Sequence, residues 1–374
     1  MRKKAKKQAS TLLHTANVLA MLVIILATAT ARMGEEAMFR RVLFSFHMPL
    51  FFLLSGLILE QHRGEGKKGW LRFIQHMVLA FVIPYFLWAL IYSMFSYQNL
   101  AWVLYGSFEA LERAKTLNIL CFLPCMFVAR LLAEAALGSL RRFKRSPRLA
   151  SLGTAVVFFA IGLLLPKIRG IGYPWCINSA FVAAGFLLLG YSLRELVEAW
   201  ARKPAAVVAA FVLSAALFCG GTVLRGERLD MVLLRSGEYG NLFWFFLNAF
   251  SGSLTVLGLS ALWTRPWKKD GPVITQRDEA GISRVTLGTF VVHMPLLQQV
   301  ILPLLGLIPL SLPPIVLFLA GMVVTKIISR WLIRGLTRFV PQLFGIYPPP
   351  KLLALPDPQS EANAGGDAVL VDTR

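Results

Sequence analysis

The chain contains about ten stretches of roughly 20 mostly apolar residues, each long enough to cross a lipid bilayer as an α-helix. Inside a bilayer every backbone N–H and C=O group needs a partner within the protein, so only helices and closed barrels can span it. The sequence therefore predicts an all-α, polytopic membrane protein with about ten transmembrane helices. The predicted spans are 12–31, 42–59, 73–95, 119–137, 149–165, 175–193, 205–223, 241–263, 285–304 and 312–333.

The composition supports this fold class. Of the 374 residues, 56% are hydrophobic and only 16% are charged, which excludes a typical soluble domain. The net charge is +20, but the basic residues form short clusters between the apolar segments. In such loops Lys and Arg set the membrane orientation and contact anionic lipid headgroups. Since no groove-reading motif accompanies the charge, we expect membrane lipids and no nucleic acid as partners.

Lys and Arg are unevenly shared between the loops. The basic N-terminus (residues 1–11) and the loops after the second, fourth, sixth and eighth spans carry more than twice as many as the opposite loops. Because cytoplasmic loops are enriched in these residues, we predict an inner-membrane protein with both termini in the cytoplasm. The N-terminus up to Ala27-Thr28-Ala29 also resembles a secretory signal peptide, but its apolar stretch is long, which favours a retained first helix.

A single transmembrane domain is predicted over residues 12–335. Residues 348–374 lack helical periodicity and are predicted to form a disordered cytoplasmic tail. The two longest outer loops, about 96–118 and 224–240, are too short for a soluble domain and could form short interfacial helices.

Two histidines mark the candidate site. His47 opens the apolar run HMPLFFLLSG, and the tetrapeptide HMPL recurs from His293 to Leu296. An ionisable side chain inside a membrane is costly and usually faces a bundle interior or a wet cavity, so both are candidate functional residues. The competing interpretation is a structural histidine bonded to a neighbouring helix. In both units a proline two residues later predicts a helix kink beside the ring.

The four cysteines give no sign of a metal site. Cys121, Cys125, Cys176 and Cys219 lie in or beside apolar segments, without a CxxC pair or zinc-ligand spacing. We therefore predict packing roles for them, with no metal and no disulfide framework. The GxSxG, HExxH, Walker and Rossmann patterns are also absent from the sequence, so it suggests no second enzyme class.

The segment Phe46–Gly56 resembles the most recognisable stretch of the acyltransferase 3 family, in particular its fucose 4-O-acetylase-like branch. Weaker matches follow in the order expected for that family. They are LCFLPCMFVARL from Leu120, YPWCINSAFVAAGFLLLGYSLRE from Tyr173, the stretch 243–258, and LGTFVVHMPLL from Leu287.

The resemblance implies ten membrane helices and a defined reaction. An acyl group, often acetyl, would move from a cytoplasmic acyl-CoA, commonly acetyl-CoA, to a sugar hydroxyl of an envelope glycan or glycolipid. The sequence departs from the family at the end of the first helix, where the usual histidine is replaced by Thr28. The arginine common about ten residues earlier is also missing, with Asn17 and Val18 in its place. Threonine has no group that titrates near neutral pH, so it cannot serve as the base.

His47 and His293 are the candidate replacements for the missing catalytic base. Arg130 and Glu134, four residues apart in one helix, and Ser55 are candidate substrate-binding residues. The arginine could meet the phosphates of CoA, although the two charged residues could equally form a structural pair. Ser55 and Gly56 could instead mark a close helix contact, because small residues let membrane helices approach.

Two other functions remain open. A catalytically deficient relative that binds or translocates a glycan or lipid would explain the missing first-helix histidine. An unrelated small-molecule transporter is disfavoured, since the sequence shows no internal hydropathy repeat. Nothing in the sequence indicates an oligomeric state.

Overall fold

The computed structural model describes residues 11–30, 33, 37–59, 66–93, 97–113, 117–140, 147–165, 168, 170–268, 287–307 and 313–347. Within these ranges the regular secondary structure is helical, apart from one antiparallel β-bridge between Leu233 and Glu238. Nine helices of this described part are long and apolar enough to cross a membrane. The predicted class, an all-α polytopic membrane protein, is therefore confirmed.

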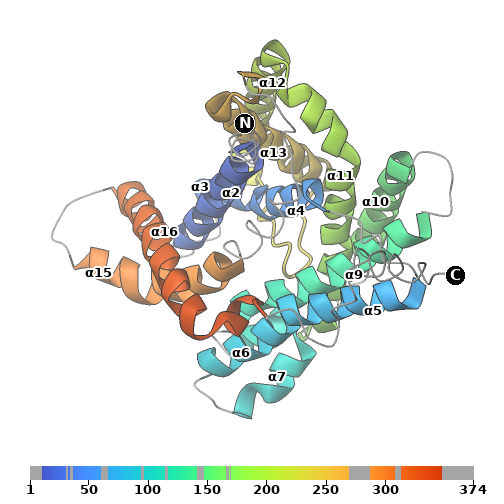
Figure 1. Ribbon diagram of the computed structural model, residues 1–374. Coiled ribbons are helices and arrows are strands. Elements are labelled where there is room, and N and C mark those ends of the chain that lie inside the picture. The colour runs from blue at the N-terminus through green and yellow to red at the C-terminus, as the bar shows by residue number, and fades with distance from the viewer. Residues whose placement is uncertain are drawn as a thin grey trace, which may run out of the picture.

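The helices follow the predicted apolar segments along the chain (Figure 1). The predicted fifth span is present as α10 (Pro147–Leu164), a shorter apolar helix. The predicted N-terminal arm up to Ser10 and the predicted tail lie outside the described residues. The remaining spans contain α2 (Thr11–Ala29), α3 (Met38–Phe44), α4 (His47–Leu57), α5 (Gly66–Met77), α6 (Ile83–Tyr92), α9 (Phe122–Leu140), α11 (Ile177–Ala201), α12 (Pro204–Arg225), α13 (Leu242–Thr264), α15 (Leu302–Gly306) and α16 (Pro314–Phe339).

The second span is broken into two helices directly before His47. α3 ends at Phe44, the Ser45 hydroxyl donates to the Val42 carbonyl at 2.8 Å, and α4 begins at His47. Pro49 therefore lies in the first turn of a helix, where a missing N–H removes no intrahelical bond. The irregularity predicted beside His47 is therefore present, as a full break at Ser45 and Phe46, on the N-terminal side of Pro49 where a proline disrupts a helix.

The second HMPL unit lies in the middle of a helix. Directly after Pro295 the helix widens into a π-helical stretch, Leu296–Ile301. A π-helical turn is one way to accommodate a residue without an N–H, and such turns are frequent at functional sites. The irregularity predicted at this proline is therefore present, as a π-helical turn.

α4 crosses α11 at close range, and Figure 1 shows α4 between α2 and α11. A Cβ atom at Gly56 would overlap the backbone carbonyl of Leu187, and one at Gly190 would overlap that of Leu53. The two glycines therefore allow the backbones to touch, as small residues do in membrane bundles. This supports the interpretation of the Ser55-Gly56 pair as a helix contact.

The two long outer loops behave differently. Residues 97–113 form η3 (Tyr97–Asn99), α7 (Leu100–Tyr105) and α8 (Phe108–Arg113), which agrees with the prediction of short helices. After η6 (Gly226–Arg228), residues 229–240 contain no helix and enter the bundle instead. We call residues 229–240 the inserted loop; in Figure 1 it runs between α4 and α9. Of the predicted loop 224–240, η6 is a short helix as expected, whereas residues 229–240 form no interfacial helix because their apolar side chains are buried in the core.

Candidate functional site

One cavity brings the two HMPL units together. It has a volume of about 100 Å³ and is lined by residues of α2, α4, α9, the 287–295 helix and the inserted loop. Both His47 and His293 line it, although their side chains are only 7% and 1% exposed. The cavity wall is mostly apolar and carries a few polar side chains, and its volume leaves room for a few water molecules or small ligand groups. The arrangement predicted for intramembrane histidines, facing a cavity inside the bundle, is the one the structure has.

His47 is held by its own helix break. Its Nδ1 lies 2.9 Å from the carbonyl oxygen of Leu43, and its ring packs edge-on against Phe44 at 4.8 Å between centroids. A carbonyl oxygen can only accept a hydrogen bond, so Nδ1 carries the proton when this bond is made. Nε2 is then the basic nitrogen of the neutral ring, and no described side chain is bonded to it.

The His293 ring also points its Nδ1 at a backbone carbonyl, but its Nε2 has a side-chain partner. Its Nδ1 lies 2.5 Å from the Phe290 carbonyl and 3.1 Å from the Thr289 carbonyl, which again leaves Nε2 as the basic nitrogen. This Nε2 lies 3.1 Å from the hydroxyl of Thr28. The Thr28 hydroxyl is also 3.0 Å from the Ile24 carbonyl, so its single proton is shared between two acceptors.

Thr28 therefore lines the cavity at the end of the first helix. The sequence resemblance predicts that Thr28 takes the place of the family's histidine, and in the structure Thr28 contacts His293, one of the two candidate replacements. Because α2 supplies this wall, the cavity is complete only when the first helix is retained.

A further polar side chain in the cavity wall is Asn118. Its Oδ1 is buried and has no hydrogen-bond partner among the described residues. Such an orphaned acceptor is rare in proteins and calls for an explanation, of which a ligand is one.

Three of the four cysteines are cavity residues as well as core residues. Cys121, Cys125 and Cys176 are buried and line the cavity, and all are free thiols. Cys176 also adopts a left-handed backbone conformation, with φ of 53°, which is strained for a residue with a side chain. Over the described ranges no group of three or more His, Cys, Asp and Glu side chains is arranged to hold a metal ion.

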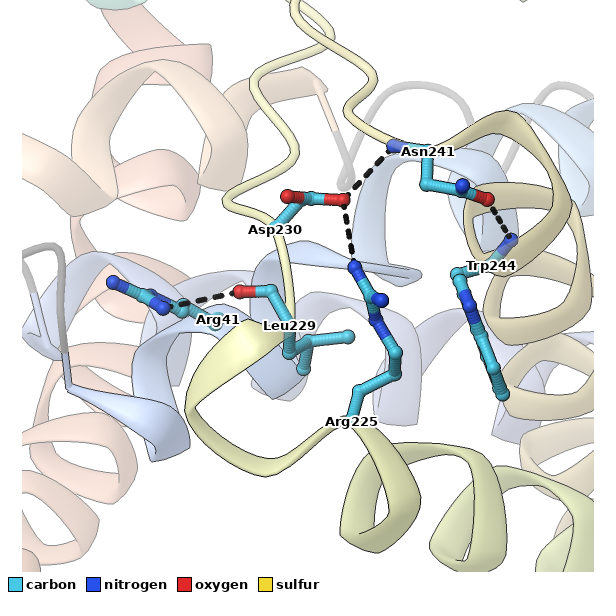
Figure 2. A network of polar contacts seen from close by, with 6 residues as sticks. All are labelled: Arg41, Arg225, Leu229, Asp230, Asn241 and Trp244. Carbon is cyan, nitrogen blue, oxygen red and sulfur yellow. Dashed lines mark hydrogen bonds and ion pairs between the residues drawn. The ribbon is translucent and has the colours of Figure 1, made fainter.

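The inserted loop closes one side of the cavity, and polar contacts fix both its ends (Figure 2). At its start the Arg41 guanidinium donates to the Leu229 carbonyl at 3.2 Å. The Asp230 carboxylate accepts from Arg225 at 3.4 Å and from the backbone N–H of Asn241 at 2.9 Å, so it joins the two ends of the loop. Asn241 in turn caps α13 by accepting from the backbone N–H of Trp244.

The tip of the inserted loop is a tight hairpin that carries Arg235 into the cavity wall. The backbones of Leu233 and Glu238 exchange two hydrogen bonds, of 2.7 and 3.0 Å. The Arg235 guanidinium lies 4.3 Å from the centroid of the Phe108 ring, a cation–π contact, and its charge acts on His47. Burial of Tyr239 raises the pKa of its hydroxyl, so this residue adds no negative charge.

The other predicted site residues are not among the described cavity residues. Arg130 and the buried Glu134 lie further along α9 than Cys125, the last residue of that helix to line the cavity. The Ser55 hydroxyl donates to the Phe51 carbonyl of its own helix at 2.9 Å. The structure thus brings the two histidines together, whereas Ser55, Arg130 and Glu134 lie away from the cavity.

Sequence reasoning missed Asn118, Cys176 and Arg235 as cavity residues. Arg235 counted only as one charge among the outer loops, because no local pattern shows that this loop turns inward. The sequence signal for an inward turn is the set of apolar residues spaced through the inserted loop. The structure buries all four of them, Leu229, Val232, Leu234 and Tyr239.

The fold and this cavity define a polytopic helical membrane protein with a buried, mostly apolar cavity that two histidines line. The model of the acyltransferase 3 family, described as an acyltransferase domain, matches residues 12–334. The chain therefore belongs to the acyltransferase 3 family, as its motifs suggested. Comparison with curated proteins and with solved structures gave no match.

Proposed function

We propose that the protein moves an acyl group, most simply acetyl, from acyl-CoA to a sugar hydroxyl of an envelope glycan or glycolipid. The observation that carries this proposal is the meeting of His47 and His293 in one cavity, each with Nε2 as its basic nitrogen. Family membership supplies the reaction class, acyl transfer, and the cavity supplies a base in place of the missing first-helix histidine.

His47 is the proposed general base. Its Nε2 would accept the proton of the acceptor hydroxyl while the hydroxyl oxygen attacks the thioester carbonyl. Collapse of the tetrahedral intermediate would then release the CoA thiol, which takes the proton back from the imidazolium. His47 suits this role better than His293, because no described side chain occupies its Nε2.

Asn118 and the pair of Thr28 and His293 would position the acceptor. The orphaned Oδ1 of Asn118 can accept a hydrogen bond from a second sugar hydroxyl, and its amide N–H groups can donate to the developing oxyanion. Thr28 would align His293 through their 3.1 Å contact.

The acyl donor would approach along α9 from the cytoplasm, in an inner-membrane protein whose two termini are both cytoplasmic. Arg130 lies five residues beyond Cys125, about 7.5 Å along the helix axis, and could meet the CoA phosphates with Glu134 limiting how far they enter. The role of Ser55 in substrate binding remains a prediction.

One observation favours a second function, that of a catalytically deficient relative that binds or translocates a glycan or lipid. Thr28 contacts the cavity at the position where the family pattern has its histidine, and it cannot act as a base.

Turnover separates the two functions. The purified full-length protein in lipid nanodiscs would be given radiolabelled acetyl-CoA and extracted envelope glycans, beside a variant with both His47→Ala and His293→Ala. Label transferred by the wild type and lost in the double variant supports the acyltransferase. Absence of transfer with acetyl-CoA and longer acyl-CoAs, together with retained glycan binding, would favour the binding protein instead.

A further inference from the structure

We propose that the rings of Phe122 and Phe290 form the floor of a pocket for the acyl group and restrict that group to the size of acetyl. This inference rests on the proposed function and adds to it the residues that select the acyl donor. Its basis is the small volume of the histidine cavity, the apolar character of its wall and the aromatic layer packed along one side of it.

Most of the cavity wall suits an acyl group. Apolar side chains supply the larger part of its surface, among them Ile24, Met48 and Ile119. Burying a sugar hydroxyl against such a surface is costly unless it finds a hydrogen-bond partner, whereas burying a methyl group is favourable. The few polar side chains, such as His47 and Asn118, can serve the acceptor hydroxyls and the carbonyl oxygen. The apolar part of the wall is therefore the place for the acyl chain.

The floor of this pocket is an aromatic layer that joins the two helices carrying the histidines. The rings of Phe122 and Phe290 both line the cavity, and their centroids lie 4.1 Å apart. The Phe290 ring is also 5.5 Å from the His293 ring, so the floor adjoins the reacting groups. Phe51 and Phe52 of α4 pack against Phe122, at 5.3 and 5.8 Å between centroids, and are buried outside the set of described cavity residues. Phe122 and Phe290 thus separate the cavity from a packed aromatic core.

The volume of the cavity limits the length of the acyl chain. A cavity of about 150 Å³ lined by Leu, Ile and Phe holds one benzene molecule, so a cavity of about 100 Å³ holds roughly four non-hydrogen atoms. The methyl carbon, carbonyl carbon, oxygen and sulfur of an acetyl thioester fill that space. Each further methylene would have to enter the aromatic layer, where overpacking forces side chains and backbone to shift. We therefore expect acetyl-CoA to be favoured over longer acyl-CoAs.

The test is a titration of the full-length protein in nanodiscs with CoA analogues in which a methylene replaces the thioester sulfur. These ketones keep the shape of acetyl-, propionyl- and hexanoyl-CoA but cannot transfer the acyl group. We expect the affinity to fall about tenfold from the acetyl to the propionyl analogue, as one extra methylene does in a closed pocket, and further for the hexanoyl analogue. The ratio of the hexanoyl to the acetyl Kd is the quantity to compare between variants.

Phe122→Ala and the milder Phe290→Leu enlarge the proposed pocket, and we expect each to lower that ratio about tenfold or more. Phe159→Ala is the matched control. Phe159 is also buried and packs against two rings, Phe186 and Phe246, but it is not among the described residues that line the cavity. Its loss should leave the ratio unchanged. Because the ratio compares two ligands on one variant, a smaller folded fraction does not alter it.

The outcomes separate the pocket from the proposed function. The assignment of the floor is overturned if the wild type binds the hexanoyl analogue as tightly as the acetyl analogue. It is also overturned if Phe122→Ala and Phe290→Leu change the ratio no more than Phe159→Ala does. In both cases, binding of the analogues would still support a CoA donor. If no analogue binds, the donor of the proposed function is wrong, and the assignment of the pocket fails with it.

Discussion

The two HMPL units have identical sequences but different structural settings. His47 is the first residue of α4, after a break in the span, whereas His293 lies within a continuous helix. Both rings place Nδ1 against a backbone carbonyl of the preceding turn. Only His293 has a side-chain partner on Nε2, the hydroxyl of Thr28. The tetrapeptide therefore fixes the tautomer through local geometry, while tertiary contacts decide which ring is free to take a proton.

The largest expected effect is that of His47→Gln. Glutamine keeps a side chain of similar length that can bond the Leu43 carbonyl, but it has no basic nitrogen. We expect kcat to fall by about 10²–10⁴-fold, the usual contribution of a general base. Initial rates of acetyl transfer would measure this. The matched control is His14→Gln, an exposed histidine in α2, which should leave kcat unchanged. Equal activity of the two variants would exclude His47 as the base.

A smaller effect is expected for His293→Gln. If His293 positions the acceptor and does not accept its proton, the loss corresponds to about one hydrogen bond, or about tenfold in kcat/KM. A loss as large as that of His47→Gln would reverse the assignment of the two roles. Kinetic assays of both variants in the same nanodisc preparation provide the comparison.

The contact between Thr28 and His293 can be removed without changing the size of the side chain. Thr28→Val deletes the hydroxyl, and we expect a two- to fivefold loss of kcat/KM, the equivalent of about 0.5–1 kcal/mol. Thr28→Ser should restore most of the activity, because it returns the hydroxyl. Failure of serine to do so would mean that the methyl group, and not the hydrogen bond, is what matters.

The smallest expected effects concern the two prolines. Pro49 fits the first turn of α4, so Pro49→Ala should lower the free energy of unfolding by about 0.4–1 kcal/mol through the unfolded chain. Pro295→Ala should cost more, because loss of the π-helical turn would rotate the buried Leu297 and Ile301 away from their contacts. Thermal unfolding of the two variants in detergent would give the order. A lower melting temperature for Pro49→Ala than for Pro295→Ala would contradict this order.

The helices were predictable because hydropathy alone defines a membrane span, and the family motifs pointed to His47 and His293. The meeting of the two rings was not predictable, since helix phase and neighbour order are set by packing such as the crossing at Gly56. Pro49 indicated an irregularity beside His47, but not that the span is divided into two separate helices. Arg235 was missed because a hairpin with ordinary loop residues is placed inside the bundle by long-range contacts such as that of Arg41 with Leu229.

The helix contact at Gly56 and Gly190 also fixes the tilt of α4. Backbone contact holds the far end of the helix against α11, and His47 stands nine residues away, about 14 Å along the axis. If α4 tilted by about 5° around this contact, the imidazole would move by about 1 Å. A displacement of that size can reduce the catalytic rate about 100-fold. The angular tolerance of the site is thus set at the other end of α4, by two glycines that do not line the cavity.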